Sequence, residues 1–311
     1  MSKSVLIISN SGDIHTDLLV EACERKKFIC FRYNTNEFRC HGNIVWNVNG
    51  NCLLKLGDRE CVISDVDLLF YRRPIAVHRG RKDIEPWVGV TLDAEWDTVE
   101  KAISYGIKGK VINPVGAVAI AQNKIAQLQL ANRLGILTPP TIISTDIVEL
   151  KKFLGQHQCI TKAIGNGNSI VDGVMRTGKT AEMSKYDLEG YDGNGCSTLL
   201  QKRIIPYAMW RIITVGEQSY GFRLIGHALS EDVDSRFVEE KLSGEYLPVP
   251  TQIKEKLKAM CNGFSLLYAS TDFIEDDRGQ LWFLDLNPEG QWGAYEKRFS
   301  VPISEYLIDL A

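Results

Sequence analysis

Short apolar stretches alternate with amphipathic ones along this sequence, and that alternation limits its fold more than any other feature. The first apolar stretch, Val5 to Ser9, precedes the turn residues Asn10 to Asp13. Next comes Thr16 to Lys27, in which apolar residues recur at helical spacing. Strand, turn and helix in this order begin an α/β unit, so the sequence predicts a mixed α/β fold.

The same alternation continues to the C-terminus. The strongest predicted helix covers 117–134, because Gly135 and then Pro139-Pro140 follow it and stop it. Residues 270–275 and 280–286 predict a hairpin across the turn residues Asp276 to Gly279. We expect further helices at 95–106, 147–154, 250–263 and 303–310, and further strands at 28–33, 43–48, 52–56, 67–71, 111–112, 141–144, 159–163, 169–176, 198–204, 208–215 and 219–228.

Length and charge exclude several classes of protein. The 311 residues are enough for about two domains. The 36 lysines and arginines nearly balance 39 aspartates and glutamates, for a net charge of −3, which excludes a broadly basic nucleic-acid binder. No apolar run approaches the roughly 18 residues of a membrane span. Met1 to Ser4 lead directly into a strand without a signal peptide, so we expect a cytoplasmic protein.

The eight cysteines are scattered, and no two of them form a C-x-x-C pair. In a chain without an export signal we expect reduced thiols rather than disulfides. Cys40-His41 is the only adjacent cysteine–histidine pair, and no second pair completes a structural zinc site.

The stretch Gly173 to Thr180 fits the phosphate-loop pattern G-x-x-x-x-G-K-[ST]. That pattern works between a buried strand and a long helix, where backbone N–H groups surround phosphates. Here Asp172 interrupts the short apolar run before the pattern, and 181–195 carries three glycines and no sustained helical stripe. We interpret the stretch as a strand and turn that match the pattern by chance.

The C-terminal hairpin carries a set of oxygen ligands. Asp272 lies in its first strand, and Asp285 and Asn287 alternate along the second. Alternation with period two places Asp285 and Asn287 on one face, where Asp272 can converge with them. Three such ligands suit Mg²⁺ at a nucleotide site, although acidic residues near hairpin ends are more often simply solvated.

Three basic residues accompany this set. Lys124 lies early in the helix predicted over 117–134, and Lys162 ends a strand just before the glycine-rich turn at 165–169. Either lysine can reach phosphates or be an ordinary surface charge. Arg211 lies inside an apolar strand, where it is either paired with a carboxylate or directed at an anion in a cleft.

Taken in order, these residues resemble a known superfamily, the ATP-grasp ligases. The segments that carry the resemblance are Asn123-Lys124, Leu134-Gly135-Ile136, Pro139-Pro140-Thr141, Lys162, Gln201 to Ile205, Trp210-Arg211-Ile212, Asp272 and Asp285 to Pro288. A narrower resemblance, to the ATP-grasp peptide maturases that make graspetides (the microviridin-type ligases), is carried by Asn287 to Trp292, Tyr71 to Pro74 and Asp234-Ser235-Arg236.

The resemblance implies an α+β grasp fold with bound ATP and Mg²⁺. It divides the chain into an N-terminal α/β pre-ATP-grasp domain (1–115), a central ATP-grasp lobe (116–197) and a C-terminal lobe with the metal site (198–311). It assigns the metal to Asp272, Asp285 and Asn287. It assigns the nucleotide to Lys124, Lys162, Gln201, Lys202, Arg203 and Ile204 together with Asp272 and Asn287, and catalysis to Arg211, Lys162 and Arg236.

The activity that the resemblance implies is ATP-dependent peptide macrocyclisation. ATP phosphorylates an Asp or Glu side chain of a ribosomal precursor peptide, and a Ser or Thr hydroxyl or a Lys amine then displaces the phosphate to give an ω-ester or an ω-amide. The implied partners are a precursor peptide with a leader and an acidic core, and a second copy of the chain in a homodimer. The alternative is an ATP-grasp carboxylate–amine ligase that acts on a small molecule or a protein tail.

Two positions depart from the family pattern, one among the metal ligands and one on the substrate side. Asp285 stands where the family commonly has Glu, and Ser235 where it has Trp. The resemblance places Trp292 and Arg236 toward the peptide, and it makes the stretch 184–196 a candidate for leader binding. Arg72-Arg73 is either a structural pair tied to Glu95 or part of a surface for an acidic peptide.

Overall fold

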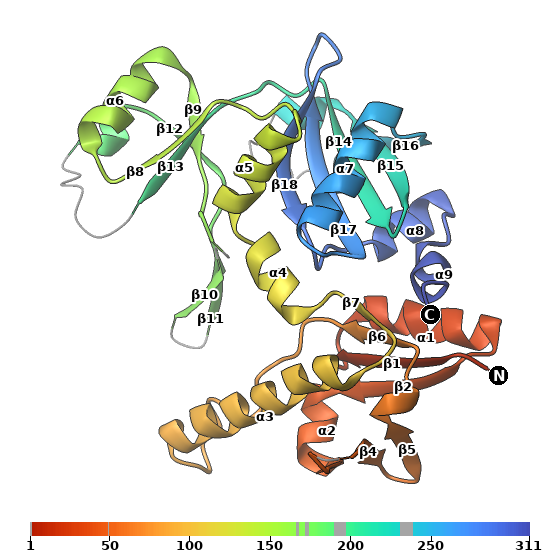
Figure 1. The fold of residues 1–311 in the computed structure, drawn as a ribbon. Helices are drawn as coiled ribbons and strands as arrows, with labels where there is room; N and C mark the ends of the chain where they lie inside the picture. The colour runs from red at the N-terminus through yellow and green to blue at the C-terminus, as the bar shows by residue number, and fades with distance from the viewer. Residues whose placement is uncertain (1, 49, 166–167, 172–173, 190–196, 231–238) are drawn as a thin grey trace.

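The structure is a computed structural model, and it describes residues 2–48, 50–165, 168–171, 174–189, 197–230 and 239–311 (Figure 1). Its N-terminal elements are β1 (Ser4–Ser9), α1 (Ile14–Lys26), β2 (Ile29–Asn34), α2 (Thr35–His41), β3 (Asn43–Trp46), β4 (Cys52–Leu56), β5 (Arg59–Val62), β6 (Leu68–Tyr71), α3 (Pro86–Gly106) and β7 (Lys110–Ile112). A parallel sheet has the order β2-β1-β6-β7, and β3, β4 and β5 form a second sheet. Val5 and Ile7 of β1 pack on one face, and Leu6 and Ile8 pack on the other. Both faces are covered, which explains the continuous apolar run.

The middle part of the chain forms another, four-stranded antiparallel sheet in a separate lobe at the upper left of Figure 1. Its part of the chain contains α4 (Val115–Ala121), α5 (Lys124–Arg133), β8 (Thr141–Ser144), α6 (Ile147–Gln156), β9 (Cys159–Thr161), β10 (Asn168–Val171), β11 (Val174–Thr177), β12 (Ala181–Met183) and β13 (Thr198–Lys202). The strand order is β12-β9-β13-β8. Leu150 and Leu154 of α6 pack against Leu200 of β13, which attaches the helix to the sheet.

The C-terminal part is a five-stranded antiparallel sheet in the order β16-β15-β14-β17-β18. Its elements are β14 (Ala208–Val215), β15 (Gln218–Ile225), β16 (Ser243–Leu247), α7 (Thr251–Gly263), β17 (Tyr268–Glu275), β18 (Leu281–Asn287), α8 (Gly293–Phe299) and α9 (Ile303–Ile308). Along β14, Trp210 and Ile212 face a core that α5 and α7 complete. Met209 and Ile213 face the other side and share a core with the N-terminal sheet. Arg211 lies between them on that second face.

Most predicted elements are confirmed, and three differ. The helix predicted over 117–134 is two helices, because the Asn123 side chain accepts hydrogen bonds from the N–H groups of Ile125 and Ala126 and begins α5 as an N-cap. The strand predicted over 169–176 is the hairpin β10-β11. The helix predicted over 95–106 begins already at Pro86. The short elements α2, β5, β12, β16 and α8 were not predicted, and the three-domain division stays a prediction.

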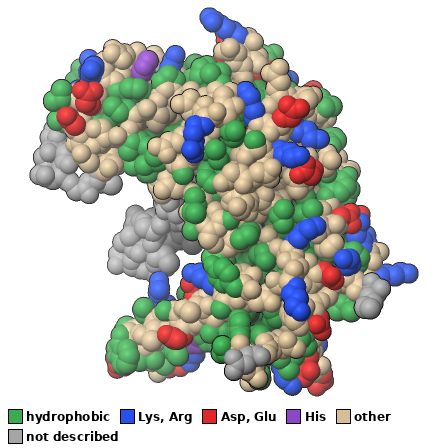
Figure 2. All heavy atoms as spheres, viewed as in Figure 1, with side chains coloured by type: hydrophobic (Ala, Val, Ile, Leu, Met, Phe, Trp, Pro, Cys, Tyr) green, Lys and Arg blue, Asp and Glu red, His purple; other side chains and the backbone are tan. Residues whose placement is uncertain are grey.

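The visible surface is mixed in charge, and the described cysteines are free thiols. Figure 2 shows basic and acidic side chains interspersed over the visible face, and a hollow between the lobe that carries α6 and the part that carries α3. None of the helices in the described ranges is long and apolar enough to cross a membrane. The seven cysteines in those ranges are free thiols, and Cys196 lies outside them. Among the described residues, no group of three or more His, Cys, Asp or Glu side chains is arranged to hold a metal. Cys40 and His41 therefore belong to no such group.

Candidate functional site

A row of charged side chains crosses the sheet from β14 to β18. Arg211 lies directly opposite Asp272, and Asp272 lies directly opposite Asp285. Directly opposite residues in an antiparallel sheet project from the same face, so the three side chains are neighbours. Asn287 follows two residues after Asp285 in β18 and is exposed, and its Oδ1 accepts a hydrogen bond from the Glu289 N–H at 2.9 Å. The structure therefore brings Asp272 and Asp285 together, and the grouping of Asn287 with them stays a prediction.

Lys162 approaches this row from the neighbouring lobe. A β-bulge after Asp272 leaves Leu284 between the paired residues of β18, and the Lys162 Nζ donates a hydrogen bond to the Leu284 carbonyl oxygen at 3.0 Å. Burial lowers the pKa of Lys162 to about 8, and Asp285 and Asp272 offset part of that effect. The ammonium group is thus a half-buried charge that an anion in the same space would stabilise.

Lys124 approaches from the start of α5. Its Nζ lies 3.8 Å from a carboxylate oxygen of Asp285. Burial raises the pKa of Asp285 above its usual range, while Lys124 and Lys162 act against that rise. Both lysines therefore lie at the Asp285 end of the row. Of the two interpretations of these lysines, this position favours a contact with phosphates, which stays a prediction.

Arg211 is paired with carboxylates, which is one of the two alternatives that the sequence left open for it. Its Nε donates to Asp272 Oδ1 at 2.7 Å, and its Nη2 donates to Oδ2 at 3.3 Å. Nη2 also lies 3.8 Å from a carboxylate oxygen of Glu239, and the guanidinium carbon lies 5.3 Å from the centre of the Tyr295 ring. Burial would lower the pKa of Arg211, but Asp272, Tyr295 and Glu239 raise it above its ordinary value.

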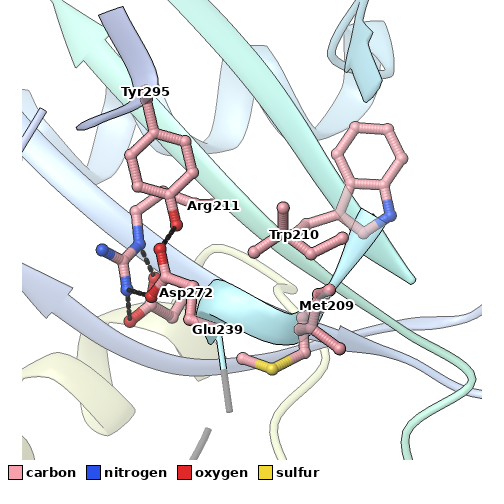
Figure 3. Close-up of a pocket in the computed structure, with 8 residues that line it drawn as sticks. Met209, Trp210, Arg211, Glu239, Asp272 and Tyr295 are labelled. Carbon is pink, nitrogen blue, oxygen red and sulfur yellow. Dashed lines mark hydrogen bonds and ion pairs between the residues drawn. The ribbon is translucent and has the colours of Figure 1, made fainter. Parts of the chain in front are cut away.

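These groups line a narrow pocket of about 10 Å³ (Figure 3). Arg211, Asp272, Glu239 and Tyr295 converge at one end, and the Trp210 indole points away from them. The remaining wall is apolar and consists of Met209, Leu224 and Leu242. An apolar wall beside a charged end strengthens electrostatic interactions inside the pocket.

A larger pocket of about 60 Å³ lies between the sheet that contains β9 and β13 and the sheet that contains β14, β17 and β18. Its apolar lining includes Pro139, Ile160, Pro206, Met209, Leu229, Ile274 and Leu284. The segment that joins β13 to β14 forms its edge with Gln201, Lys202, Arg203 and Ile204. Gln201 is fully buried, its side-chain Nε2 donates to Thr141 Oγ1, and its Oε1 has no hydrogen-bond partner among the described residues. This apolar slot, which polar groups edge, suits a planar heterocycle.

Trp292 is not on the peptide side, and that prediction is wrong. Its side chain is fully buried, its ring packs against those of His15, Phe70 and Tyr268, and its indole N–H donates to Ser304 Oγ. Trp292 therefore joins the N-terminal and C-terminal parts of the core instead of contacting a ligand.

Arg72 is structural, but its partner is not Glu95. Its Nε donates to Asp13 Oδ2 at 2.8 Å, its Nη1 donates to the carbonyl oxygens of Glu289 and Gly290, and its guanidinium carbon lies 5.0 Å from the centre of the Trp292 ring. Arg73 is exposed beside the same turn, with Nη2 donating to the Glu289 carbonyl oxygen. The pair therefore fixes the segment that follows Asn287.

Some predicted residues lie outside the described residues. These are Arg236 and its motif from Asp234, part of the phosphate-loop match (Gly173), and most of the leader-binding candidate (190–196). Sequence reasoning missed Glu239, Tyr295 and the apolar lining of the larger pocket. Met209 could have been found, because it alternates with Arg211 on the same face of β14.

The comparisons with known proteins identify the fold. No protein-family model matches the sequence, and no curated protein matches it. Among solved structures, the chain is similar to the macrocyclase MdnC from Microcystis aeruginosa MRC, bound with the precursor peptide MdnA, with a TM-score of 0.87, 22% identity and coverage of 99% of this chain and 98% of that one. A Chryseobacterium gregarium RiPP-associated ATP-grasp ligase in complex with ADP and a leader and core peptide gives a TM-score of 0.87, 19% identity and coverage of 99% and 96%.

A third structure is that of the ATP-grasp ligase PsnB, complexed with a phosphomimetic variant of its minimal precursor, Mg and ADP. Its TM-score is 0.75 at 17% identity, with coverage of 100% of this chain and 98% of that one. At these identities the likeness concerns the fold. The chain therefore has the ATP-grasp fold with the N-terminal α/β domain that precedes it, which confirms the predicted fold class.

Proposed function

We propose that this protein is an ADP-forming ligase that activates an Asp or Glu side chain of a peptide with ATP and joins it to a hydroxyl or an amine of the same peptide. The observation that carries the proposal is the row of Arg211, Asp272 and Asp285, which two lysines flank at the end of an apolar slot. An apolar slot followed by cations and carboxylates is what a nucleoside triphosphate requires.

ATP would lie with its base in the larger pocket and its phosphates toward the row. Gln201 supports this placement, because its unpartnered buried oxygen can accept a hydrogen bond from an exocyclic amine. The backbone of Lys202 to Ile204 edges the same slot. Lys124 and Lys162 then face the phosphates, and the cost of burying Lys162 falls when a phosphate is beside it.

The donor set fits Mg²⁺. Magnesium at nucleotides is usually held by one or two carboxylates together with phosphate oxygens and water, so the absence of a larger acidic group among the described residues is no obstacle. Asp272 and Asp285 would hold it, with Asn287 as the third ligand. When bound, the ion would neutralise negative charge on the β- and γ-phosphates.

The peptide carboxylate would attack the γ-phosphate beside Arg211, whose guanidinium neutralises the charge of the group in transfer. The resulting acyl phosphate then reacts with a Ser or Thr hydroxyl or a Lys amine, and phosphate leaves. A peptide is supported as the substrate by the precursor peptides bound to MdnC, to the Chryseobacterium ligase and to PsnB. The cytoplasmic location, the homodimer, and the roles of Arg236 and 184–196 belong to the same proposal.

Mass spectrometry tests the proposal. The protein is incubated with ATP, Mg²⁺ and peptides that combine Asp or Glu with Thr, Ser or Lys, with and without a leader segment. We expect ADP and phosphate to form together with loss of one water per ring from the peptide. Formation of ADP with a small amine and an unchanged peptide would instead support the carboxylate–amine ligase, and the absence of turnover with every acceptor would contradict both.

A further inference from the structure

Glu239 lies in the reaction pocket, and the proposed function gives it no role so far. Its carboxylate is paired with Arg211 and accepts a hydrogen bond from the Tyr295 hydroxyl. We propose that Glu239 is the base that takes the proton from the attacking hydroxyl or amine, and that Tyr295 is the residue that positions it. This inference deepens the proposed function and rests on it.

Arg211 contacts two carboxylates, and it holds one of them more tightly than the other. Its Nε faces Asp272, which belongs to the row that also contains Asp285. Its Nη2 reaches both Asp272 and, at 3.8 Å, Glu239. The described residues that line this pocket include Arg211, Asp272 and Glu239 but not Asp285 or the two lysines. Glu239 therefore marks a second side of the site, beside Tyr295 (Figure 3). The group that Arg211 neutralises is within reach of a nucleophile approaching from that second side.

The environment of Glu239 suits a base better than that of the other two carboxylates. Asp285 lies beside two lysines, and Asp272 holds Arg211 through two hydrogen bonds, so both are committed to neutralising charge. Glu239 has a longer ion pair with Arg211 and a hydrogen bond from the Tyr295 hydroxyl. That hydrogen bond uses one oxygen and leaves the remaining lone pairs available to accept a proton.

Tyr295 is rigid enough to position the carboxylate. It belongs to α8, it is buried, and its ring packs against Phe222 and Phe299. Burial, with the nearby Glu239 and Asp272 carboxylates, raises its pKa, so the hydroxyl stays protonated and remains a donor. A fixed donor defines where the carboxylate lies, which is the usual requirement for a base in general-base catalysis.

In the second step the peptide's acyl phosphate is the electrophile. The hydroxyl oxygen (or amine nitrogen) of the acceptor attacks the carbonyl carbon of the acyl phosphate, and the bond between that carbon and the bridging phosphate oxygen breaks. Phosphate leaves with the electron pair of that bond, and Glu239 takes the proton of the nucleophile. The apolar wall of Met209, Leu224 and Leu242 limits the water that could attack instead.

Hydroxylamine separates this step from the one before it, because it converts an accumulated acyl phosphate to a hydroxamate. The experiment measures ring formation and hydroxamate formation on the same peptide with ATP and Mg²⁺. Glu239→Gln keeps the size of the side chain and its ability to accept from Tyr295, but it removes the base. We expect ring formation to fall on the order of 100-fold or more, with hydroxamate formation at or above the wild-type level.

Glu245→Gln is the matched control. Glu245 is an exposed carboxylate on β16, directly opposite Arg223, and Arg223 pairs with Trp210 on the other face of the sheet. We expect this variant to form rings at the wild-type rate. Tyr295→Phe should lower ring formation relative to hydroxamate formation, as Glu239→Gln does, but by less, because the Glu239 carboxylate remains. A structural defect would lower ring formation and hydroxamate formation together.

The outcomes distinguish this inference from the proposed function. If Glu239→Gln closes rings at the wild-type rate, Glu239 is not the base and the leaving phosphate or water takes the proton. If the variant loses hydroxamate and ring equally while thermal unfolding shows an intact fold, Glu239 acts in phosphorylation and the inference is also wrong. If the wild-type protein itself gives neither ADP nor hydroxamate, the proposed function fails instead.

Discussion

The half-buried Lys162 makes a quantitative prediction about how nucleotide affinity depends on pH. Its pKa in the free protein is about 8, below the ordinary value of 10.5. Bound phosphates favour the charged ammonium and raise that pKa again. Below pH 8 the lysine is already protonated and binding needs no extra proton. As pH rises through 8, binding must also draw a proton from solution, so affinity is lost.

The size of the effect follows from the pKa. Lys162 is about 90% protonated at about pH 7 and about 10% protonated at about pH 9, which makes nucleotide binding about tenfold weaker at the higher pH, or about 1.4 kcal/mol. Titration calorimetry with a non-hydrolysable ATP analogue, run in buffers of different ionisation enthalpy, measures both the affinity and the proton uptake. We expect proton uptake to appear above about pH 8.

Lys162→Arg is the control, because a guanidinium stays charged throughout this range. Its affinity should be nearly flat from neutral to mildly alkaline pH, whatever its absolute value. If the wild-type protein shows the same flat profile, or binds more tightly as the pH rises, then Lys162 does not meet the phosphates and its place in the proposed site is wrong.

Three further predictions follow from burial and from the charged row. Trp292→Ala should lower the free energy of unfolding by about 3–5 kcal/mol, as for other buried large aromatic residues. Trp87→Ala is the control, because this side chain is 69% exposed, and it should change the free energy of unfolding by less than about 0.5 kcal/mol. Urea unfolding compares the two variants, and equal effects would show that Trp292 is not a core residue. Asp285→Ala should lower ATP turnover at least about 100-fold and leave the circular dichroism spectrum unchanged. Chelation of Mg²⁺ should lower the turnover of the wild-type protein in the same way. Retained turnover would refute the metal assignment. Lys179→Ala should leave turnover nearly unchanged, and a large loss would restore the phosphate-loop interpretation.

Local patterns were enough to predict the elements that carry the site. The strand 208–215 matches β14 residue for residue, since all of its residues except Arg211 and Thr214 are apolar. Asp272, Asp285 and Asn287 could be grouped from the period of a strand alone. The break between α4 and α5 was missed, because Asn123 acts as a cap through hydrogen bonds that an otherwise helical pattern conceals.

Contacts between distant parts of the chain could not be predicted in this way. Trp292 looked like a ligand-facing aromatic because its partners, Phe70 and His15, are more than two hundred residues away in sequence. Glu239 and Tyr295 gave no signal either, since each belongs to a short element and they meet Arg211 only in the folded sheet. Such residues depend on tertiary packing, which local propensity does not encode.

The central claim is that the peptide carboxyl group is activated by phosphorylation. A peptide whose Asp or Glu side-chain carboxyl carries heavy oxygen tests it most directly, with ATP, Mg²⁺ and mass spectrometry of the phosphate released. The account predicts ADP as the nucleotide product and one heavy oxygen in the phosphate for every ring formed. Phosphate without the label, or AMP in place of ADP, would contradict it.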